Sequence, residues 1–396
     1  MTPISPALSV PDHATLFPEA ALYLHFPFCA RKCLYCDFPS FAGQDDQMTR
    51  FLEVLHKEID AAPRLRVRTI FLGGGTPSYL PGPWMAEVMA HLHRHFDIRP
   101  DAEITMEANP GNERLHAGEA QVEWARYREM GINRISLGVQ SFDQGVLTAL
   151  GRIHSPQEAI DAVAAVKAGG FTNLSIDLMY GLPNQTMDHW RATLEQAVRL
   201  DLPHLSAYSL IVEPHTPFDS LERQGKLRLP SEDDEQAMAA LANEVLTAAG
   251  YRQYEISNWA RPGFESRHNQ VYWFNEPWLG LGSGAHSYYA RRRWANPTTI
   301  PAYLSQGPTP MPEAPQSLAE EIEETMFMGL RMTREGVTDA RFRARFGVGL
   351  RDVYGPVIDT LVRDGLLGWE GDRLALTRRG LPLANEAFSA FLQPTT

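Results

Sequence analysis

The sequence predicts an α/β protein with a parallel sheet, followed by a small, mostly helical domain. From residue 21 to residue 250 of the 396-residue chain, short apolar runs rich in β-forming residues alternate with amphipathic helical segments. This alternation is typical of right-handed strand–helix–strand units, which build parallel sheets. A Pro-rich stretch at 307–316 ends the pattern, and further helical segments follow it. The periodicity by itself leaves an open barrel and a doubly wound sheet as alternatives.

Each predicted strand is a short apolar run bounded by turn residues. In chain order the strands are Leu22–His25, Thr69–Leu72, Ile104–Glu107, Arg134–Leu137, Leu174–Leu178 and His204–Ser209. The helices between and after them are Met48–Ala61, Pro83–His95, Val122–Met130, Pro156–Ala168, Met187–Leu200 and Ser231–Gly250. In barrels of parallel strands the functional residues gather at the C-terminal ends of the strands. Polar residues at those ends are therefore candidate site residues.

Five segments are expected along the chain. They are an N-terminal extension at 1–20, the strand–helix core at 21–250, an aromatic-rich segment at 251–306, a Pro-rich linker at 307–316 and a C-terminal domain at 317–396. The stretch from Tyr251 to Tyr289 is expected to be irregular. In the last domain, helices at Leu318–Leu330, Ala340–Phe346 and Val353–Asp364, a hairpin at 365–377 and a final helix resemble a winged-helix domain.

The charge of the chain disfavours two classes of partner. A net charge of −12 opposes broad attraction to nucleic acid or to an anionic membrane. From Glu313 onward, 10 Arg and no Lys against 13 acidic residues give −3. A DNA-reading wing is normally basic, so a structural or protein-contact role is favoured. No apolar run approaches the roughly 20 residues of a membrane span, and the N-terminus does not resemble a signal peptide. We expect a cytoplasmic protein.

All three cysteines lie in one eight-residue segment, Cys29-Ala-Arg-Lys-Cys33-Leu-Tyr-Cys36. Three thiolates can hold three irons of a [4Fe–4S] cluster and leave the fourth iron open, whereas clusters that only carry electrons are normally held by four cysteines. A disulfide framework is disfavoured by the odd count. A structural zinc site would need a fourth ligand such as His25 and usually a second Cys/His pair, which is absent from the sequence. The pattern favours the cluster.

The spacing C-x3-C-x2-C, followed by Asp37-Phe38-Pro39, resembles the radical S-adenosylmethionine (SAM) superfamily. That resemblance implies an open (β/α)6 partial TIM-type barrel, in which the open iron chelates the amino and carboxylate groups of SAM. It also implies that Tyr23 lies near the methionyl end of SAM and that Tyr35 touches the adenine. Taken alone, Tyr23 is as consistent with packing.

The segment Gly73-Gly74-Gly75-Thr76-Pro77 directly follows the second strand. Glycines allow backbone groups to approach a ligand closely, although any βα turn could contain such a triplet. The resemblance assigns Gly74, Gly75 and Thr76 to the SAM amino group.

Four polar residues at or just after strand ends, Glu107, Gln140, Arg152 and Asp177, would separately suit salt bridges or caps. The resemblance gives the acidic residue the SAM ammonium, the arginine the carboxylate, and Gln140 and Asp177 the ribose hydroxyls.

His268 stands in the segment Arg267-His-Asn-Gln-Val-Tyr-Trp273. A neutral imidazole flanked by aromatic rings could bind haem iron, or it could cap a loop above an aromatic core. The residues by themselves favour the second interpretation.

The motifs together resemble oxygen-independent coproporphyrinogen III oxidase and its relatives, from about Ala21 to the C-terminus. The oxidase has a further cysteine two places after the third, where this chain has Phe38. The pattern His-Asn-x-x-Tyr-Trp at His268–Trp273 is instead the signature of the haem chaperone branch, HemW, and favours haem binding by His268.

That resemblance implies a protein that binds haem and a SAM-ligated [4Fe–4S] cluster and hands haem to acceptor proteins such as respiratory enzymes. Contact with a membrane would be at most peripheral, through those acceptors. It assigns no catalytic residue and leaves open whether SAM is cleaved. One alternative is a radical SAM enzyme acting on a tetrapyrrole, either the oxidase itself or a haem-modifying enzyme. The other, a winged-helix regulator, is disfavoured by the acidic charge.

Overall fold

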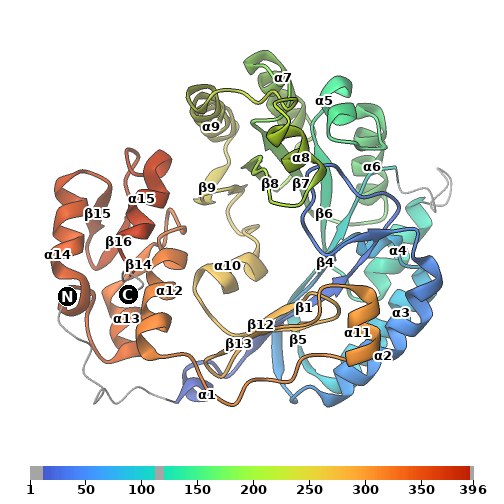
Figure 1. Cartoon of the computed structure of the whole chain (residues 1–396), viewed down its shortest axis with the longest axis horizontal. Helices are drawn as coiled ribbons and strands as arrows, with labels where there is room; N and C mark the ends of the chain where they lie inside the picture. Colours follow the sequence, from blue (N-terminus) through green and yellow to red (C-terminus); the bar gives the residue numbers. More distant parts are fainter. Residues whose placement is uncertain (1–11, 112–119, 393–396) are drawn as a thin grey trace.

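The computed structural model describes residues 12–111 and 120–392, apart from the side chains of 120–122. Its centre is a sheet in the order β13-β12-β11-β1-β4-β5-β6-β7-β8-β10-β9 (Figure 1). The central strands, all parallel, are β1 (Ala20–Phe26), β4 (Arg66–Gly74), β5 (Asp97–Ala108), β6 (Arg134–Gln140), β7 (Asn173–Tyr180) and β8 (His204–Ser209). They curve into the predicted partial barrel of six strand–helix units.

Helices cover the outer face of this sheet (Figure 1). They are α2 (Met48–Ala61), α3 (Gly82–His95), α4 (Ala120–Glu129), α6 (Pro156–Ala168), α7 (Met187–Arg199) and α9 (Glu232–Ala248). Apolar faces drive this packing: in α2, Phe51, Leu55 and Ile59 are fully buried. Capping boxes fix the starts of α6 and α9, where Ser155 and Ser231 cap the first backbone N–H groups. All of these helices were predicted from the sequence.

The segment after α9 is not irregular, and that expectation was wrong. It extends the sheet at both edges: β9 (Arg252–Glu255) and β10 (Asn258–Ala260) follow β8, while β11 (Trp278–Leu281), β12 (His286–Tyr289) and β13 (Arg292–Ala295) continue from β1. These strands have only three or four residues, so their own sequence shows no periodicity. Strand β11 pairs in parallel with β1 and β10 pairs antiparallel with β8, and β12, β13 and β9 extend these two additions outward.

The C-terminal domain has its own buried core, which includes Ile322, Phe346 and Leu374. It contains α12 (Leu318–Gly329), β14 (Val337–Thr338), α13 (Asp339–Phe346), α14 (Leu350–Arg363), β15 (Leu367–Glu370), β16 (Arg373–Leu376) and α15 (Ala384–Ser389). The strands pair in the order β14-β16-β15. The three helices, the hairpin and the final helix follow the predicted order. Helix α14 begins three residues earlier than expected, at Leu350, whose N–H donates to Asp339 Oδ1 at 2.7 Å.

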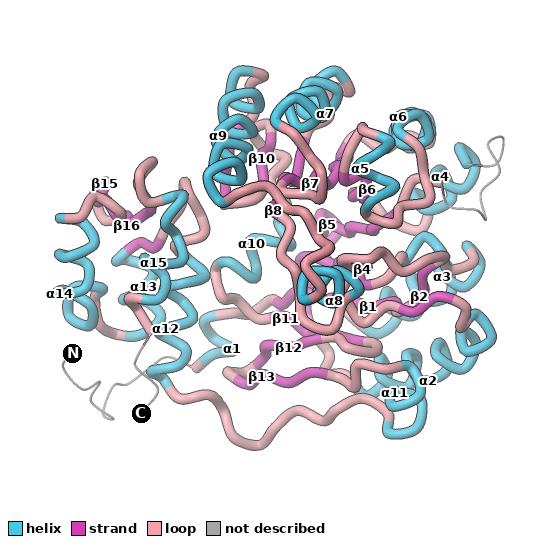
Figure 2. The backbone as a smooth tube through the Cα atoms, turned by 45° about the horizontal axis from the view of Figure 1, so that its top comes forward, coloured by secondary structure: helices cyan, strands magenta, loops and turns pink. Residues whose placement is uncertain are grey.

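Helix α10 (Arg267–Trp273) lies between the barrel and the C-terminal domain (Figures 1 and 2). It contacts β4 on one side and α12 on the other. The haem signature found in the sequence is therefore placed at the junction of the two parts of the protein.

The remaining elements are short. They are α1 (His13–Leu16), β2 (Phe28–Cys29), β3 (Phe41–Ala42), α5 (Gln144–Ala149), α8 (Pro217–Arg223), α11 (Ile300–Gln306) and 3-10 turns at Asp45–Gln47, Pro77–Tyr79 and Leu381–Leu383. Within the described residues, no helix is both long enough and apolar enough to cross a membrane.

Candidate cofactor site

The three cysteines lie on a loop that follows β1. Strands β2 and β3 pair in parallel and hold the two ends of this loop together. Its middle is fixed through Leu34, whose N–H donates to Leu150 O at 3.2 Å and whose carbonyl accepts from Phe218 N at 3.1 Å. Cys29 is buried, whereas Cys33 and Cys36 are partly exposed. The loop is thus closed at its base and open at its tip.

Each sulfur atom has a polar neighbour. Thr76 Oγ1 lies 3.4 Å from Cys29 Sγ, Arg152 Nη1 lies 3.4 Å from Cys33 Sγ, and Ser40 Oγ lies 3.6 Å from Cys36 Sγ. Burial raises the pKa of the Cys29 thiol to about 11 and also raises that of Cys36. The hydroxyl and guanidinium groups can donate hydrogen bonds to thiolates. Bound iron would supply the positive charge that favours the thiolate form over the thiol. This donor set fits an iron–sulfur cluster.

A structural zinc site would need a fourth ligand such as His25, and this histidine is already engaged. His25 uses Nε2 on Pro39 O at 2.8 Å and Nδ1 on Tyr23 Oη at 3.0 Å, so both of its ring nitrogens have partners. Throughout the described part of the chain, no three His, Cys, Asp or Glu side chains gather closely enough to hold a single metal ion.

The glycine triplet at the end of β4 lets the strand approach the cysteine loop. A Cβ atom on Gly75 would lie 2.7 Å from Phe28 O and 3.0 Å from Cys29 Sγ. A Cβ atom on Gly74, whose φ is +108°, would lie 2.7 Å from the His25 ring. Both contacts are too close for any other residue, so a side chain here would displace the loop or the histidine.

The backbone of the triplet also hydrogen-bonds within the protein. Gly75 N donates to Phe26 O at 2.8 Å, and Thr76 N donates to Phe28 O at 2.9 Å. Gly74 N donates to Glu107 Oε2 at 3.2 Å. These bonds tie the second strand of the core to the loop and to the carboxylate at the end of β5.

Two half-buried residues, Glu107 and Asp177, place carboxyl groups inside the barrel. Burial, with a smaller contribution from Asp177, raises the pKa of Glu107 to about 8. Burial also raises the pKa of Asp177, although Ser136 Oγ donates to Asp177 Oδ1 at 3.1 Å. Neither carboxyl group has an ion-pair partner among the described residues. A cationic ligand would lower the pKa of both carboxyl groups, because an opposite charge favours the ionised form.

Asn109, Gln140 and Arg152 converge above Gly138. A Cβ atom on this glycine would lie 2.7 Å from Asn109 Oδ1, 3.1 Å from Gln140 Nε2 and 3.5 Å from Arg152 Nη2. Arg152 Nη2 donates to Asn109 Oδ1 at 2.6 Å, and Tyr208 Oη donates to Gln140 Oε1 at 3.1 Å. Gln140 has a φ of 68°, an unusual backbone conformation for this residue type that often marks functional positions.

The two predicted tyrosines have different neighbours in this space. Tyr23 lies half-buried beside Glu107, and its ring stacks on Phe71 with a centroid distance of 6.2 Å. Tyr35, on the cysteine loop, lies near Arg152 and Asp177, and burial raises its pKa. The structure therefore brings together the residues that the sequence assigned to SAM from β1, β4, β5, β6, β7 and the loops after them.

His268 lies deeper in the same barrel interior. Its ring is fully buried and packs on Phe71 at 5.1 Å, so Phe71 lies between it and Tyr23. Its Nδ1 lies 2.9 Å from Thr69 Oγ1 and its Nε2 lies 2.9 Å from Tyr272 Oη. Burial, followed by the charges of Arg68 and Arg134, lowers the pKa of His268 to about 3. The imidazole is therefore neutral and hydrogen-bonded at both nitrogens.

Glu103 on β5 anchors the start of α10. Its carboxylate accepts hydrogen bonds from Arg267 N at 3.0 Å and from His268 N at 2.9 Å. N–H groups at the start of a helix have no partner within the helix, and a carboxylate that accepts from them stabilises the helix. The backbone of the haem signature is thus fixed to the barrel wall.

Sequence reasoning missed several of these residues. Asn109 stands two places after Glu107, and Tyr208 lies near the end of β8, so the strand-end rule could have identified both. Glu103 could have been noticed as an acidic residue within an apolar strand. Thr69 carries no such signal, because its role depends on a histidine 199 positions later. Phe38, which replaces the oxidase cysteine, is 61% exposed on the loop.

Comparison with known families matches two parts of the chain. Residues 23–197 match the radical SAM superfamily, and residues 316–383 match the HemN C-terminal domain. The first match contains the cysteine loop, the glycine triplet and all four polar strand-end residues. The second covers most of the C-terminal domain.

Curated relatives match over nearly the whole chain. The haem chaperone HemW of Lactococcus lactis is 38% identical over 95% of this chain and 97% of its own length. HemW of Bacillus subtilis is 37% identical over 93% and 98%, and HemW of Escherichia coli is 36% identical over 95% and 98%. The solved structure of coproporphyrinogen III oxidase (HemN) from Escherichia coli, a radical SAM enzyme, superposes with a TM-score of 0.80 over 95% of this chain and 91% of that one, at 24% identity. It confirms the fold.

Proposed function

The chain belongs to the HemW family of haem chaperones within the radical SAM superfamily, and on that premise we propose that it binds haem together with a SAM-ligated [4Fe–4S] cluster and transfers the haem to acceptor proteins. The single observation that carries the haem assignment is the placement of His268, which lies in the barrel interior one aromatic ring away from Tyr23. The acceptors would be proteins such as respiratory enzymes. The expected place of action is the cytoplasm, with neither nucleic acid nor direct membrane binding.

In this proposal Cys29, Cys33 and Cys36 hold the cluster, which when bound leaves one iron open to chelate SAM. Glu107 faces the SAM amino group, and Arg152 faces the carboxylate. The other residues proposed to contact SAM are Tyr23, Tyr35, Gly74, Gly75, Thr76, Gln140 and Asp177. Asn109 acts as a positioning residue, because its amide bonds both Thr76 Oγ1 at 2.8 Å and Arg152.

His268 offers iron a neutral nitrogen, as haem ligation requires. Thr69 holds Nδ1, so Nε2 is the ligand atom in this proposal, and the hydrogen bond from Tyr272 must open before iron can bind there. Glu103 keeps the backbone of His268 in place while the side chains rearrange.

The test is reconstitution of the cluster under anaerobic conditions, followed by titration with haem and, separately, with coproporphyrinogen III. We expect one haem per chain, a Soret band typical of nitrogen ligation, and no decarboxylation. His268→Ala should lose the haem and keep its iron–sulfur content. His93→Ala, an exposed histidine on α3, is the matched control and should bind haem normally.

Two results would contradict the proposal. Haem uptake that is unchanged in His268→Ala would remove that residue from the site. Robust conversion of coproporphyrinogen III by the wild type would favour an oxidase instead.

A further inference from the structure

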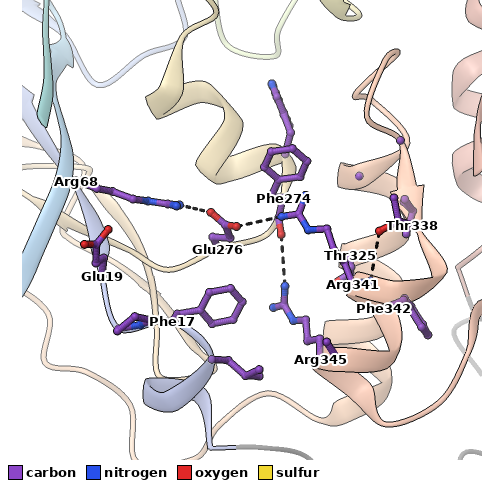
Figure 3. A pocket seen from close by; sticks show the side chains of 17 residues that line it. Phe17, Glu19, Arg68, Phe274, Glu276, Thr325, Thr338, Arg341, Phe342 and Arg345 are labelled. Atoms are coloured by element: carbon purple, nitrogen blue, oxygen red, sulfur yellow. Dashed lines mark hydrogen bonds and ion pairs between the residues drawn. The ribbon is translucent and has the colours of Figure 1, made fainter. Parts of the chain in front are cut away.

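A cavity of about 340 Å³ lies between β4, the end of α10 and helix α13 (Figure 3). Its volume is within the range of about 300–1,000 Å³ that is usual for small-molecule sites. The barrel supplies one wall and the C-terminal domain supplies the other. The aromatic side chains that line it are Phe17, Trp273, Phe274 and Phe342, and the cationic ones are Arg68, Arg341 and Arg345. The carboxylates of Glu19 and Glu276 line it as well. The cavity is therefore mostly apolar, with a charged side on which arginines outnumber carboxylates.

Two of these arginines, one from each wall, share a single carboxylate. Arg68 Nη2 bonds Glu276 Oε2, and Arg341 Nη2 lies 3.2 Å from Glu276 Oε1 (Figure 3). Arg68 also has a buried Nε atom with no hydrogen-bond partner. Guanidinium groups are the preferred partners of carboxylates because their planar N–H donors match the two oxygens. Arg68 and Arg341 are thus already spaced to bind one carboxylate, and the Nε–H donor of Arg68 is unused.

The third arginine serves a different purpose. Arg345 bonds Glu321 Oε1 through Nε at 2.9 Å, Tyr288 Oη at 3.0 Å and Phe274 O at 3.4 Å. Each of its three guanidinium nitrogens has a partner, and only 8% of its side chain is exposed. It holds the cavity wall in shape and leaves Arg68 and Arg341 as the groups available to an anion.

The aromatic rings indicate a flat ligand. The Arg341 guanidinium lies over the Phe274 ring at 4.0 Å, so the cationic pair is directly next to an aromatic surface. Among the described residues that line the cavity none is His, Cys or Met. The cavity therefore presents no nitrogen or sulfur ligand to a metal ion, and recognition there depends on the carboxylates and the apolar plane of a ligand.

Two residues that line the cavity belong to the elements that hold His268. Trp273 is the last residue of the haem signature and lines the cavity. Arg68 precedes Thr69, whose hydroxyl bonds the His268 ring. The charge of Arg68 is also one cause of the low pKa of His268. A ligand in the cavity would thus contact the same helix and the same strand that hold the histidine.

Resting on the haem binding proposed above, we propose that this cavity takes the carboxylate-bearing edge of the porphyrin, with Arg68 and Arg341 as its propionate-binding residues. The C-terminal domain then has a defined role, because it supplies Arg341 and most of the far wall. Glu276 occupies the same guanidinium groups in the absence of haem and competes with the propionate.

The experiment is titration of the full-length protein with haemin and with haemin dimethyl ester, whose propionates are neutral. Wild type should bind the ester at least tenfold more weakly than haemin. Arg68→Gln and Arg341→Gln should each weaken haemin binding about tenfold, the usual loss of a charge-assisted hydrogen bond. Each should reduce the preference for haemin over the ester by the same factor, and the double variant should bind haemin and the ester alike. Glu276→Gln should have the opposite effect and tighten haemin binding.

Arg343→Gln is the matched control. Arg343 is on the same helix as Arg341 but pairs with Asp339 and Asp352 outside the cavity. Its haemin affinity should equal that of wild type. The comparison of haemin with its ester is made on the wild type. It therefore tests the role of the propionates even if a substitution impairs folding.

Each result has a distinct meaning. Equal affinity of wild type for haemin and for the ester would overturn the proposal, as would a preference for haemin that persists when both Arg68 and Arg341 are changed. Failure of the wild type to bind haemin at all would contradict the proposed function itself.

Discussion

His268 and Tyr272 lie one helical turn apart on α10, with the tyrosine hydroxyl 2.9 Å from Nε2 of the histidine. The hydroxyl of Thr69 lies 2.9 Å from the other ring nitrogen. A buried imidazole with both nitrogens hydrogen-bonded is a stable arrangement, and it must change before a metal can bind. In the proposed function, Tyr272 therefore controls access to the ligand atom.

Tyr272→Phe should strengthen haem binding by up to about tenfold. The variant no longer has to break a hydrogen bond whose net contribution is about 0.5–1.5 kcal/mol. Titration of the Soret band measures the effect. Tyr251→Phe, which loses a hydrogen bond to Leu202 O away from α10, should leave haem affinity unchanged. Weaker binding by Tyr272→Phe would show that the phenol itself contacts the haem.

Replacement of Cys29, Cys33 or Cys36 with Ala should abolish the cluster. Wild type should contain about four irons per chain after reconstitution, and each variant should lose the brown absorbance, because the loop has no spare thiol. Circular dichroism should still report a folded barrel. Ser40→Ala removes only a hydroxyl next to Cys36 and should retain the iron. A full cluster in the triple variant would rule out this site.

Affinity for SAM should rise with pH up to about pH 8. Burial raises the pKa of Glu107 to about 8, so at neutral pH the free protein holds this carboxyl group protonated. The amino group of SAM donates hydrogen bonds to the ionised carboxylate, so SAM binding favours that form and should release a proton. Calorimetric titrations between pH 6.5 and 8.5 measure the slope. Glu107→Gln should bind SAM more weakly and without this pH dependence. A slope that persists in the variant would assign the proton to another group.

The same carboxyl group should make the cluster-free protein less stable as pH rises. Its pKa is about 8 in the folded state against about 4.5 ordinarily, so the folded state binds more protons than the unfolded state between these values. The free energy of unfolding contributed by Glu107 is therefore complete below about pH 4.5 and falls as pH rises toward 8. Urea unfolding of wild type and Glu107→Gln should diverge over this window, with the variant relatively more stable at pH 8.

Asp177→Ala should weaken SAM binding by about 1–3 kcal/mol, the usual loss when buried hydrogen-bonding groups are left without partners. The EPR signal of the reduced cluster should change on addition of SAM in wild type, and higher SAM concentrations should be needed in the variant. Asp188→Ala, an exposed residue on α7, should behave as wild type. A signal indifferent to SAM would instead indicate a cluster for electron transfer or structure.

The core of the fold was predictable because its signals are local. Helices α2 and α6 and strand β8 begin and end at the residues that the periodicity predicted. Long amphipathic helices show their pattern in consecutive residues because each helix must bury one apolar stripe. Buried parallel strands do so because each must bury both faces. The cysteine motif is equally local, with three cysteines in one segment of eight residues.

The tertiary structure decided what depends on partners far apart in the sequence. Strands β9 to β13 are too short to show a period, and they form because the barrel offers two open edges. His268 is oriented by Thr69, 199 positions away. Arg68 and Arg341 meet on Glu276 only because the C-terminal domain folds back onto β4. Such contacts arise from burial and charge pairing between separate elements, and no single segment of sequence encodes them.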